Sequence, residues 1–207
     1  MPAAGLCESL IETIRFVHQR GWAPGTGGNF SAVLSRAPLR LVITPSGSDK
    51  GRIGARDLIE IDGNGDVLRG TGAASAETLL HLAIVVHRGA EVVLHTHSVW
   101  NTLLSRQYAH DGELVIDGYE MLKGLQGVKT HEHREHLPIL INGQDMPALS
   151  AQLTDALRRY PACHGVLVVG HGLYTWGEDM SEARRHVEIW EFLFEVVARE
   201  RLRDARI

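Results

Sequence analysis

Apolar positions recur every three or four residues in five segments of the chain, and this spacing predicts amphipathic helices. In the first segment, Leu10, Ile11, Ile14 and Val17 fall on one side of such a helix, and Gly21 is a plausible stop. Residues 119–124 predict a short helix or turn. The five longer predicted helices cover residues 9–20, 75–88, 98–107, 146–160 and 180–203.

Strands are predicted where apolar residues alternate with polar ones or form short unbroken runs. Residues 58–68 contain two such stretches on either side of turn residues, the pattern of a hairpin. Because strands and helices are interleaved, we expect an α/β fold with a mixed, largely antiparallel central sheet flanked by helices. No linker or repeat divides residues 1–207, so a single domain is expected. One further short strand is predicted directly after the glycine-rich segment 24–31. The remaining predicted strands cover residues 39–43, 91–97, 137–142 and 165–177, and a turn interrupts the last of them.

Composition narrows the classes of function. The 207 residues are 44% hydrophobic and carry a net charge of −4, which does not fit the basic footprint of a nucleic-acid-binding protein. No apolar run is long enough to cross a membrane, and no signal peptide is recognisable. Cys7 and Cys163 lie far apart in the sequence, so a reducing, cytoplasmic setting is expected. The 12 histidines favour metal binding or acid–base chemistry.

One pair of histidines lies at the end of an apolar strand. His95 and His97 are two residues apart in "EVVLHTHSVW", so both side chains leave the same face of a strand and can reach one ion. From this spacing alone, a metal site and two hydrogen-bonded histidines are equally good interpretations. A catalytic zinc usually has three protein ligands and an open position. The best third ligand is His171, which lies between two glycines after another apolar strand.

A second histidine cluster competes with the first. His131, His133 and His136 lie in "THEHREH", where every residue is polar. We interpret this segment as a solvated loop, which lacks the rigid support that a tight metal site needs. It could still contribute to binding of a substrate.

Two carboxylates are candidates for acid–base work. Glu77 lies at the start of the helix that leads into the His-x-His strand, and Glu120 lies in "DGYEMLKG" after it. The ordinary alternatives are a helix-start acid favoured by the helix dipole and a surface acid near Lys123. Either carboxylate could transfer a proton if it were held near a metal.

Two glycine-bearing turns could bind an anion through backbone N–H groups, hydroxyls and an ammonium group. The first, "GTGGNFS", contains Gly28 and Asn29, and the second, "TPSGSDK", contains Ser46, Gly47 and Lys50. A third possible contact, Ser75, lies near a helix N-terminus. Neither turn matches a P-loop, and two ordinary turns are the alternative.

These segments occur in an order that resembles the class II aldolase/adducin family: "GTGGNFS", "ITPSGSDKG", "SAETLLH", "LHTHS" and "GHGLYTWG". The resemblance implies one Zn2+ per subunit on His95, His97 and His171, and a homotetramer, often with active sites between subunits. It further places Glu77 at the family's carboxylate before the His-x-His pair. The implied phosphate pocket consists of Gly28, Asn29, Ser46, Gly47 and Ser75.

Within the family, "HTHS", "YEMLKG" and "HGLYTWG" are most similar to the branch that removes water from a phosphorylated methylthio-ketose. That branch implies catalytic acid–base work for Glu120. We therefore expect a zinc-dependent dehydratase acting on a small sugar phosphate, with no nucleic-acid or membrane partner. The alternatives are an aldolase or 4-epimerase acting on another ketose phosphate, and a non-catalytic adducin-like interaction domain.

Overall fold

Nine strands form the centre of the molecule in the order β4-β3-β2-β1-β5-β9-β8-β7-β6. We use a computed structural model, which describes residues 2–204. Every neighbouring pair in the sheet is antiparallel except β7 and β8, which are parallel. The mixed, mostly antiparallel sheet is therefore confirmed. The strands are β1 (Asn29–Arg36), β2 (Leu39–Ile43), β3 (Ile59–Asp62), β4 (Val67–Arg69), β5 (Val92–Thr96), β6 (Glu113–Ile116), β7 (Glu135–Leu140), β8 (Gly165–Val168) and β9 (Gly172–Gly177).

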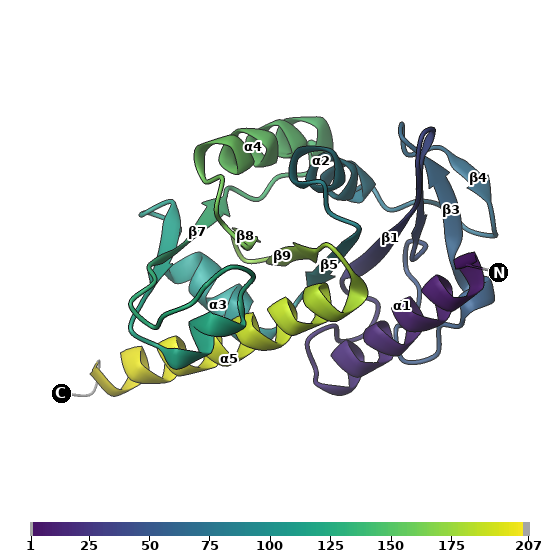
Figure 1. Cartoon of the computed structure of the whole chain (residues 1–207). Helices are drawn as coiled ribbons and strands as arrows, with labels where there is room; N and C mark the ends of the chain where they lie inside the picture. The colour runs from purple at the N-terminus through teal and green to yellow at the C-terminus, as the bar shows by residue number, and fades with distance from the viewer. Residues whose placement is uncertain (1, 205–207) are drawn as a thin grey trace.

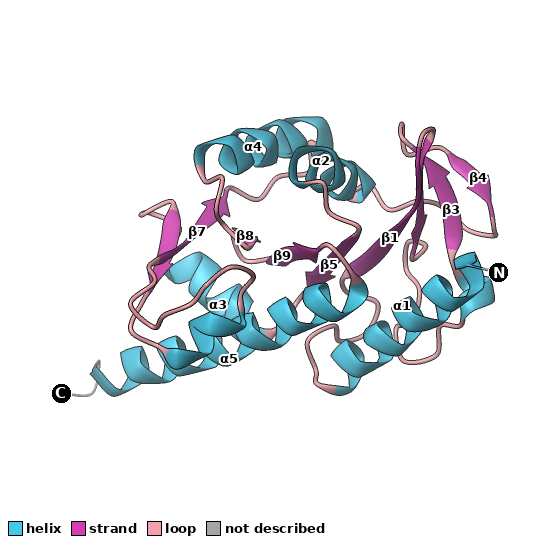
Figure 2. Ribbon diagram, viewed as in Figure 1, coloured by secondary structure: helices cyan, strands magenta, loops and turns pink. Residues whose placement is uncertain are grey.

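Helices cover both faces of this sheet (Figures 1 and 2). On one face α2 (Thr78–Arg88) and α4 (Met146–Arg159) pack against each other and against a core that includes Leu80, Leu153 and Tyr174. On the other face lie α1 (Pro2–Gln19), α3 (Val99–Gln107) and the long α5 (Met180–Asp204). Two short 3-10 turns, η1 (Ala55–Asp57) and η2 (Glu120–Gly124), complete the fold. No helix in residues 2–204 is long and apolar enough to cross a membrane.

The strand β5 lies in the middle of the sheet. It pairs with β1 on one side, where Asn29 is opposite His95, and with β9 on the other, where Leu173 is opposite Thr96. All five of its residues are buried. The end of β5 is therefore enclosed by the first residues of β1 and β9, and their side chains are brought to one place.

Most predicted elements are present, and two departures have clear physical causes. The strand β6 was not predicted, because its four residues lie between turns and carry too little periodicity to be distinguished from a loop. The segment 131–136 is not a fully solvated loop, because β7 begins inside it at Glu135, whose side chain is 1% exposed. The helix α3 is capped by Ser98, whose hydroxyl accepts a hydrogen bond from the backbone amide of Asn101.

Candidate metal and active site

Three imidazoles converge at the end of β5. His95 belongs to the strand and His97 follows its last residue, so the two rings leave the same face. His171 reaches them from the turn between β8 and β9. The Nε2 atom of His95 lies 2.7 Å from Nε2 of His97 and 3.3 Å from Nε2 of His171. The structure thus brings the three predicted metal ligands together.

Glu77 closes the cluster from the N-terminus of α2. Its Oε1 atom lies 2.9 Å from Nε2 of His171 and 3.7 Å from Nε2 of His95. Burial raises the pKa of this carboxyl, but the hydrogen bond from His171 and the electrostatic interactions with His95 and His171 outweigh burial and hold the pKa well below its usual range. Glu77 is therefore an ionised carboxylate facing three imidazoles.

The donor set fits a divalent metal ion. Nδ1 of His95 donates to the carbonyl oxygen of Leu173 at 2.9 Å, which leaves a lone pair on Nε2. Burial, together with the charge of His97, lowers the pKa of His95 well below its ordinary value, so this ring is neutral. One ligand atom from each of Glu77, His95, His97 and His171 lies within 4.8 Å of the others, and residues 2–204 contain no other such group of three or more. Two nitrogens bound to a tetrahedral zinc at about 2.0–2.1 Å would lie roughly 3.3 Å apart. The His95–His171 separation has this value, and the His95–His97 separation of 2.7 Å is shorter.

Two glycines allow the backbone to approach the imidazoles closely. A Cβ atom on Gly172 would lie 2.1 Å from the carbonyl oxygen of Thr96 and 3.0 Å from ring carbons of both His95 and His97. A Cβ atom on Gly28 would lie 2.4 Å from the carbonyl oxygen of His95, and Gly28 also has a φ of +74°. The sequence "GHGL" and the glycine-rich turn therefore shape the walls of the cluster as well as its connections.

A buried network behind Glu77 was not predicted from the sequence. Asn29 donates a short hydrogen bond to Oε2 of Glu77, and its Oδ1 atom lies 2.5 Å from Nε2 of His81. Nδ1 of His81 lies 2.7 Å from the hydroxyl of Ser31. The spacing contained a signal: His81 is four residues after Glu77 on a helix, and Ser31 is two after Asn29 on a strand, so each pair shares a face.

A second unpredicted carboxyl lies beneath the ligand strand. Glu191 on α5 accepts hydrogen bonds from Thr96 Oγ1 at 3.4 Å and from Asn101 Nδ2 at 3.3 Å, and its other oxygen has no partner. Burial raises the pKa of Glu191 to about 7, although hydrogen bonds with Ser98, Thr96 and Asn101 oppose the shift. This carboxyl connects α5 to the segment that carries His95 and His97.

The two predicted anion-binding turns lie next to each other. Lys50 is 1% exposed, and its ammonium group donates to the carbonyl oxygens of Thr26 and Ser48 and to the Ser48 hydroxyl at 2.9–3.2 Å. Burial lowers the pKa of Lys50 to about 8, against the opposing charges of Glu77 and Asp49. The lysine thus ties the first turn to the second.

The remaining predicted phosphate contacts differ in their exposure. Ser46 and Gly47 are exposed at the second turn, and Ser75 is half-buried beside the metal cluster. The Ser75 hydroxyl accepts from the Glu77 backbone amide at 3.2 Å and lies 3.5 Å from Asn29 Nδ2. The Asn29 amide itself is engaged by Glu77 and His81. A phosphate contact of each of these residues stays a prediction.

Glu120 lies apart from the cluster within its own chain. It is on η2, where its exposed carboxylate forms a short ion pair with Lys123 and lies 3.4 Å from Nδ1 of His131. No contact joins it to Glu77 or to the three imidazoles among the described residues. Sequence position alone could not show this separation, because η2 and the metal cluster are brought into place by different elements.

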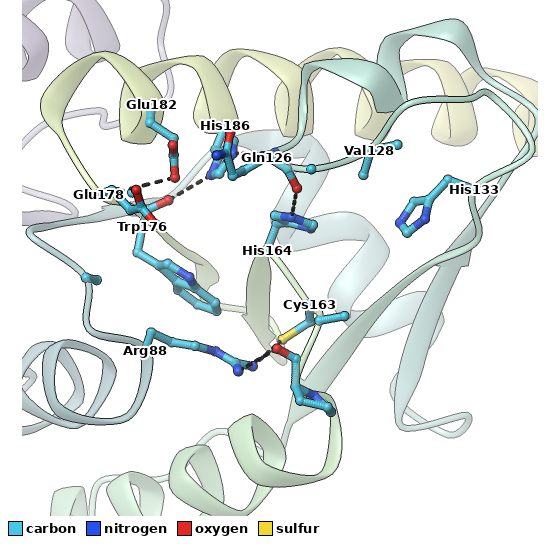
Figure 3. Close-up of a pocket in the computed structure, with 15 residues that line it drawn as sticks. Arg88, Gln126, Val128, His133, Cys163, His164, Trp176, Glu178, Glu182 and His186 are labelled. Carbon is cyan, nitrogen blue, oxygen red and sulfur yellow. Dashed lines mark hydrogen bonds between the residues drawn. The ribbon is translucent and has the colours of Figure 1, made fainter.

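The rival histidines do not form a metal site. His131 faces Glu120, His133 Nε2 lies 2.7 Å from Glu135, and His136 Nδ1 lies 2.8 Å from Glu113. His133 instead lines a cavity of about 380 Å³ together with Arg88, Cys163, His164 and Trp176 (Figure 3). None of the lining residues belongs to the metal cluster, so this hollow is a separate feature.

Comparison with known proteins gives a consistent result. The family description "Class II Aldolase and Adducin N-terminal domain" matches residues 8–198. A methylthioribulose-1-phosphate dehydratase from Marinobacter nauticus is 42% identical over 193 residues, covering 93% of this chain and 92% of that protein. A protein of the same name from Hahella chejuensis is 44% identical over 187 residues, covering 90% and 89%.

Solved structures show the same fold. YgbL from Escherichia coli, described as a putative aldolase/epimerase/decarboxylase, superposes with a TM-score of 0.79 at 25% identity and covers 95% of this chain and 90% of its own. An L-fuculose 1-phosphate aldolase superposes with a TM-score of 0.78 at 22% identity, covering 95% and 86%.

Proposed function

This chain belongs to the class II aldolase and adducin family, and from that membership we propose that it dehydrates 5-methylthioribulose 1-phosphate to 2,3-diketo-5-methylthiopentyl 1-phosphate, a step of methionine salvage. The observation that carries the proposal is the convergence of Glu77, His95, His97 and His171 on one point. It joins full-length similarity to dehydratases with a site equipped for their chemistry.

The metal we propose is zinc, one ion per subunit. Three neutral imidazoles are a common ligand set for catalytic zinc, which keeps a further position open for substrate. When bound, the ion would act as a Lewis acid on the C2 carbonyl and C3 oxygen of the substrate, which makes the C3 proton more acidic. His95, His97 and His171 would hold it, with Glu77 beside them.

The reaction needs one group that removes the proton from C3 and supplies a proton to the hydroxyl group on C4. The C3–H bond breaks, its electron pair forms the C3–C4 double bond, and the C4 hydroxyl leaves as water after taking up a proton. The enol at C3 then becomes the second ketone. We assign the proton transfer to Glu120 and the orientation of the substrate's polar groups to Glu77, whose low pKa suits a permanent acceptor better than a shuttle.

Assignment of Glu120 requires a second copy of the chain. Its carboxylate is exposed on η2 and is not in contact with the metal cluster of its own chain. An exposed catalytic group on a chain that assembles into a closed ring can complete the site of a neighbour. We therefore propose a homotetramer in which Glu120 acts between subunits. The free thiols of Cys7 and Cys163 suit the reducing cytoplasm, where we place the enzyme.

The substrate phosphate would be bound by the two adjacent turns. Gly28, Asn29, Ser46, Gly47 and Ser75 supply backbone amides and hydroxyls, and the buried Lys50 adds a positive charge while holding the turns together. Contacts so far from the reacting carbons serve to position them for reaction.

Product analysis tests the proposal. Purified protein with bound zinc is incubated with 5-methylthioribulose 1-phosphate, and the expected product is the diketone. Appearance of dihydroxyacetone phosphate alone would mean C–C cleavage and would favour an aldolase. A protein that neither contains stoichiometric metal nor recovers it on dialysis against zinc would instead be an adducin-like interaction domain.

The carboxylates are tested separately. Glu120→Gln is expected to lower kcat by about 100-fold or more, since general acid–base catalysis contributes roughly 10²–10⁴-fold. Glu77→Gln removes a charge next to the metal ligands and is expected to reduce both bound zinc and turnover. Full activity of Glu120→Gln would refute its role as the acid and base.

A further inference from the structure

A line of hydrogen bonds runs from the interior of the protein to the metal cluster. Asn29 and Ser31 point from one face of β1, and Glu77 and His81 point from one turn of α2. The order of contact is Ser31, His81, Asn29, Glu77, with separations of 2.7 Å for the first pair and 2.5 Å for the second. Ser31 and His81 are 0% exposed, so water cannot replace either contact.

Chemistry fixes the direction of each bond in this line. The NH2 group of the Asn29 amide faces Oε2 of Glu77 and donates a hydrogen bond to it. The carbonyl oxygen of Asn29 then faces His81, whose Nε2 must carry a proton to donate to it. Because burial lowers the pKa of His81 to about 4, its ring is neutral and its Nδ1 accepts from the Ser31 hydroxyl.

We propose that Ser31 and His81 are positioning residues that hold the Asn29 amide in the orientation in which it donates to Glu77. If His81 carried its proton on Nδ1 instead, Nε2 would become an acceptor. Asn29 would then turn its NH2 group toward His81 and its oxygen toward the carboxylate. The carbonyl oxygen of Asn29 and the carboxylate of Glu77, both acceptors, would then face each other. Glu77 would no longer be held in its position beside His171.

The contacts of the His81 side chain indicate no other role. Its ring packs edge-on against Tyr174 with centroids 5.8 Å apart, and Tyr174 in turn stacks on His95 at 3.8 Å. Its two nitrogens are fully used by Ser31 and Asn29. The positioning role of Ser31 and His81 rests on the proposed function in one respect: Glu77 must lie beside the substrate.

A matched pair of substitutions tests the proposal. In His81→Gln the side-chain amide reaches the position of Nε2 and can still donate to Asn29. In His81→Asn the shorter side chain reaches only the position of Nδ1, so Asn29 has no donor. With zinc content measured for both, His81→Asn is expected to lower kcat by about 10–100-fold, the usual effect of removing a group behind a metal site. His81→Gln should stay within a few-fold of the wild type.

A purely structural role for His81 would make the two variants lose activity and melting temperature together. Equal losses, or a His81→Asn variant with wild-type kcat, would overturn the proposal. Ser31→Ala is a second test of the proposal. It removes the hydroxyl that donates to Nδ1 of His81 and so favours the tautomer in which Nδ1 carries no proton.

A spectroscopic measurement separates this inference from the proposed function. Nitrogen-15 spectra of histidine-labelled protein distinguish the two neutral tautomers, and the His81→Gln spectrum identifies the signal of His81. The expected form is Nε2–H in the wild type, with Nδ1–H appearing in Ser31→Ala. A wild-type His81 protonated on Nδ1, or on both nitrogens, would overturn the proposal whether or not the methylthio substrate is turned over. Failure to form the diketone would bear on the proposed function alone.

Discussion

Adding one methyl group at Gly172 is a sharp test of the metal cluster. Gly172 is not among the glycines with positive φ, so alanine is allowed by the backbone and the effect is one of space alone. Its Cβ atom would lie 2.1 Å from the carbonyl oxygen of Thr96, whereas carbon and oxygen make close contact at about 3.3 Å. Strands β5 and β9 would therefore separate locally by roughly 1 Å.

That displacement acts directly on the ligands, because the same Cβ atom would lie 3.0 Å from ring carbons of His95 and His97. A misplacement of about 1 Å in a catalytic constellation costs on the order of 100-fold in rate. Overpacking of a buried position costs about 1–3 kcal/mol of folding free energy. For a chain of this size, that corresponds to a fall in melting temperature of roughly 2–12 °C.

The assay combines metal content, turnover and thermal unfolding of Gly172→Ala. The matched control is Gly143→Ala, because a Cβ atom at Gly143 meets nothing within 4 Å. The control is expected to keep wild-type zinc and activity. If Gly172→Ala also kept both, the close approach of β9 to the imidazoles would not be what shapes the site, and the reasoning would be refuted.

Three further predictions follow from the site. Co-expression of inactive Glu120→Gln with inactive His97→Ala should restore up to about a quarter of wild-type turnover. In a randomly mixed ring, half of the subunits keep His97, and half of their neighbours keep Glu120. No recovery in verified mixed tetramers would place Glu120 in its own chain's site. Chelation of zinc should lower the melting temperature reversibly, by roughly 8–16 °C at a free zinc concentration about 1,000-fold above its Kd, and an unchanged melting curve would mean that no such ion is bound. Glu191→Gln should be more stable than the wild type at pH 8 by about 3 kcal/mol, and much less so at pH 5, in denaturant unfolding. The pKa of Glu191 rises from 4.5 to about 7 on folding, so the folded state binds more protons between these values and wild-type stability falls as pH rises through them; a pH-independent difference would contradict the shift.

Much of the cluster could be predicted from the sequence because its geometry is local. His95 and His97 share a face by strand alternation, and Glu77 was placed correctly at a helix start. The third ligand depended on His171 lying in a glycine-flanked turn after an apolar strand. The pairing of β9 with β5 then brings that turn to the end of the His-x-His strand.

The contacts between elements could not be predicted in the same way. The hydrogen bonds of the Asn29 side chain to Glu77 and His81 were not foreseen, because they join β1 to the start of α2. Glu135 was taken for a solvated acid, although its carboxylate is buried between His133 and His164. Among the described residues Glu120 contacts Lys123 and His131 and none of the metal-cluster residues. Each case depends on which faces of distant segments meet, which periodicity does not encode.

The central place of β5 in the sheet has a consequence for how the protein opens. A strand paired on both sides exchanges its amide hydrogens only when the sheet itself unfolds, so the amide of His95 should be among the last to exchange. Glu120 lies on a short 3-10 turn outside the sheet, where its carboxylate is exposed. The strand that carries His95 should therefore stay folded in any local opening that leaves the sheet intact, including separation from a neighbouring subunit.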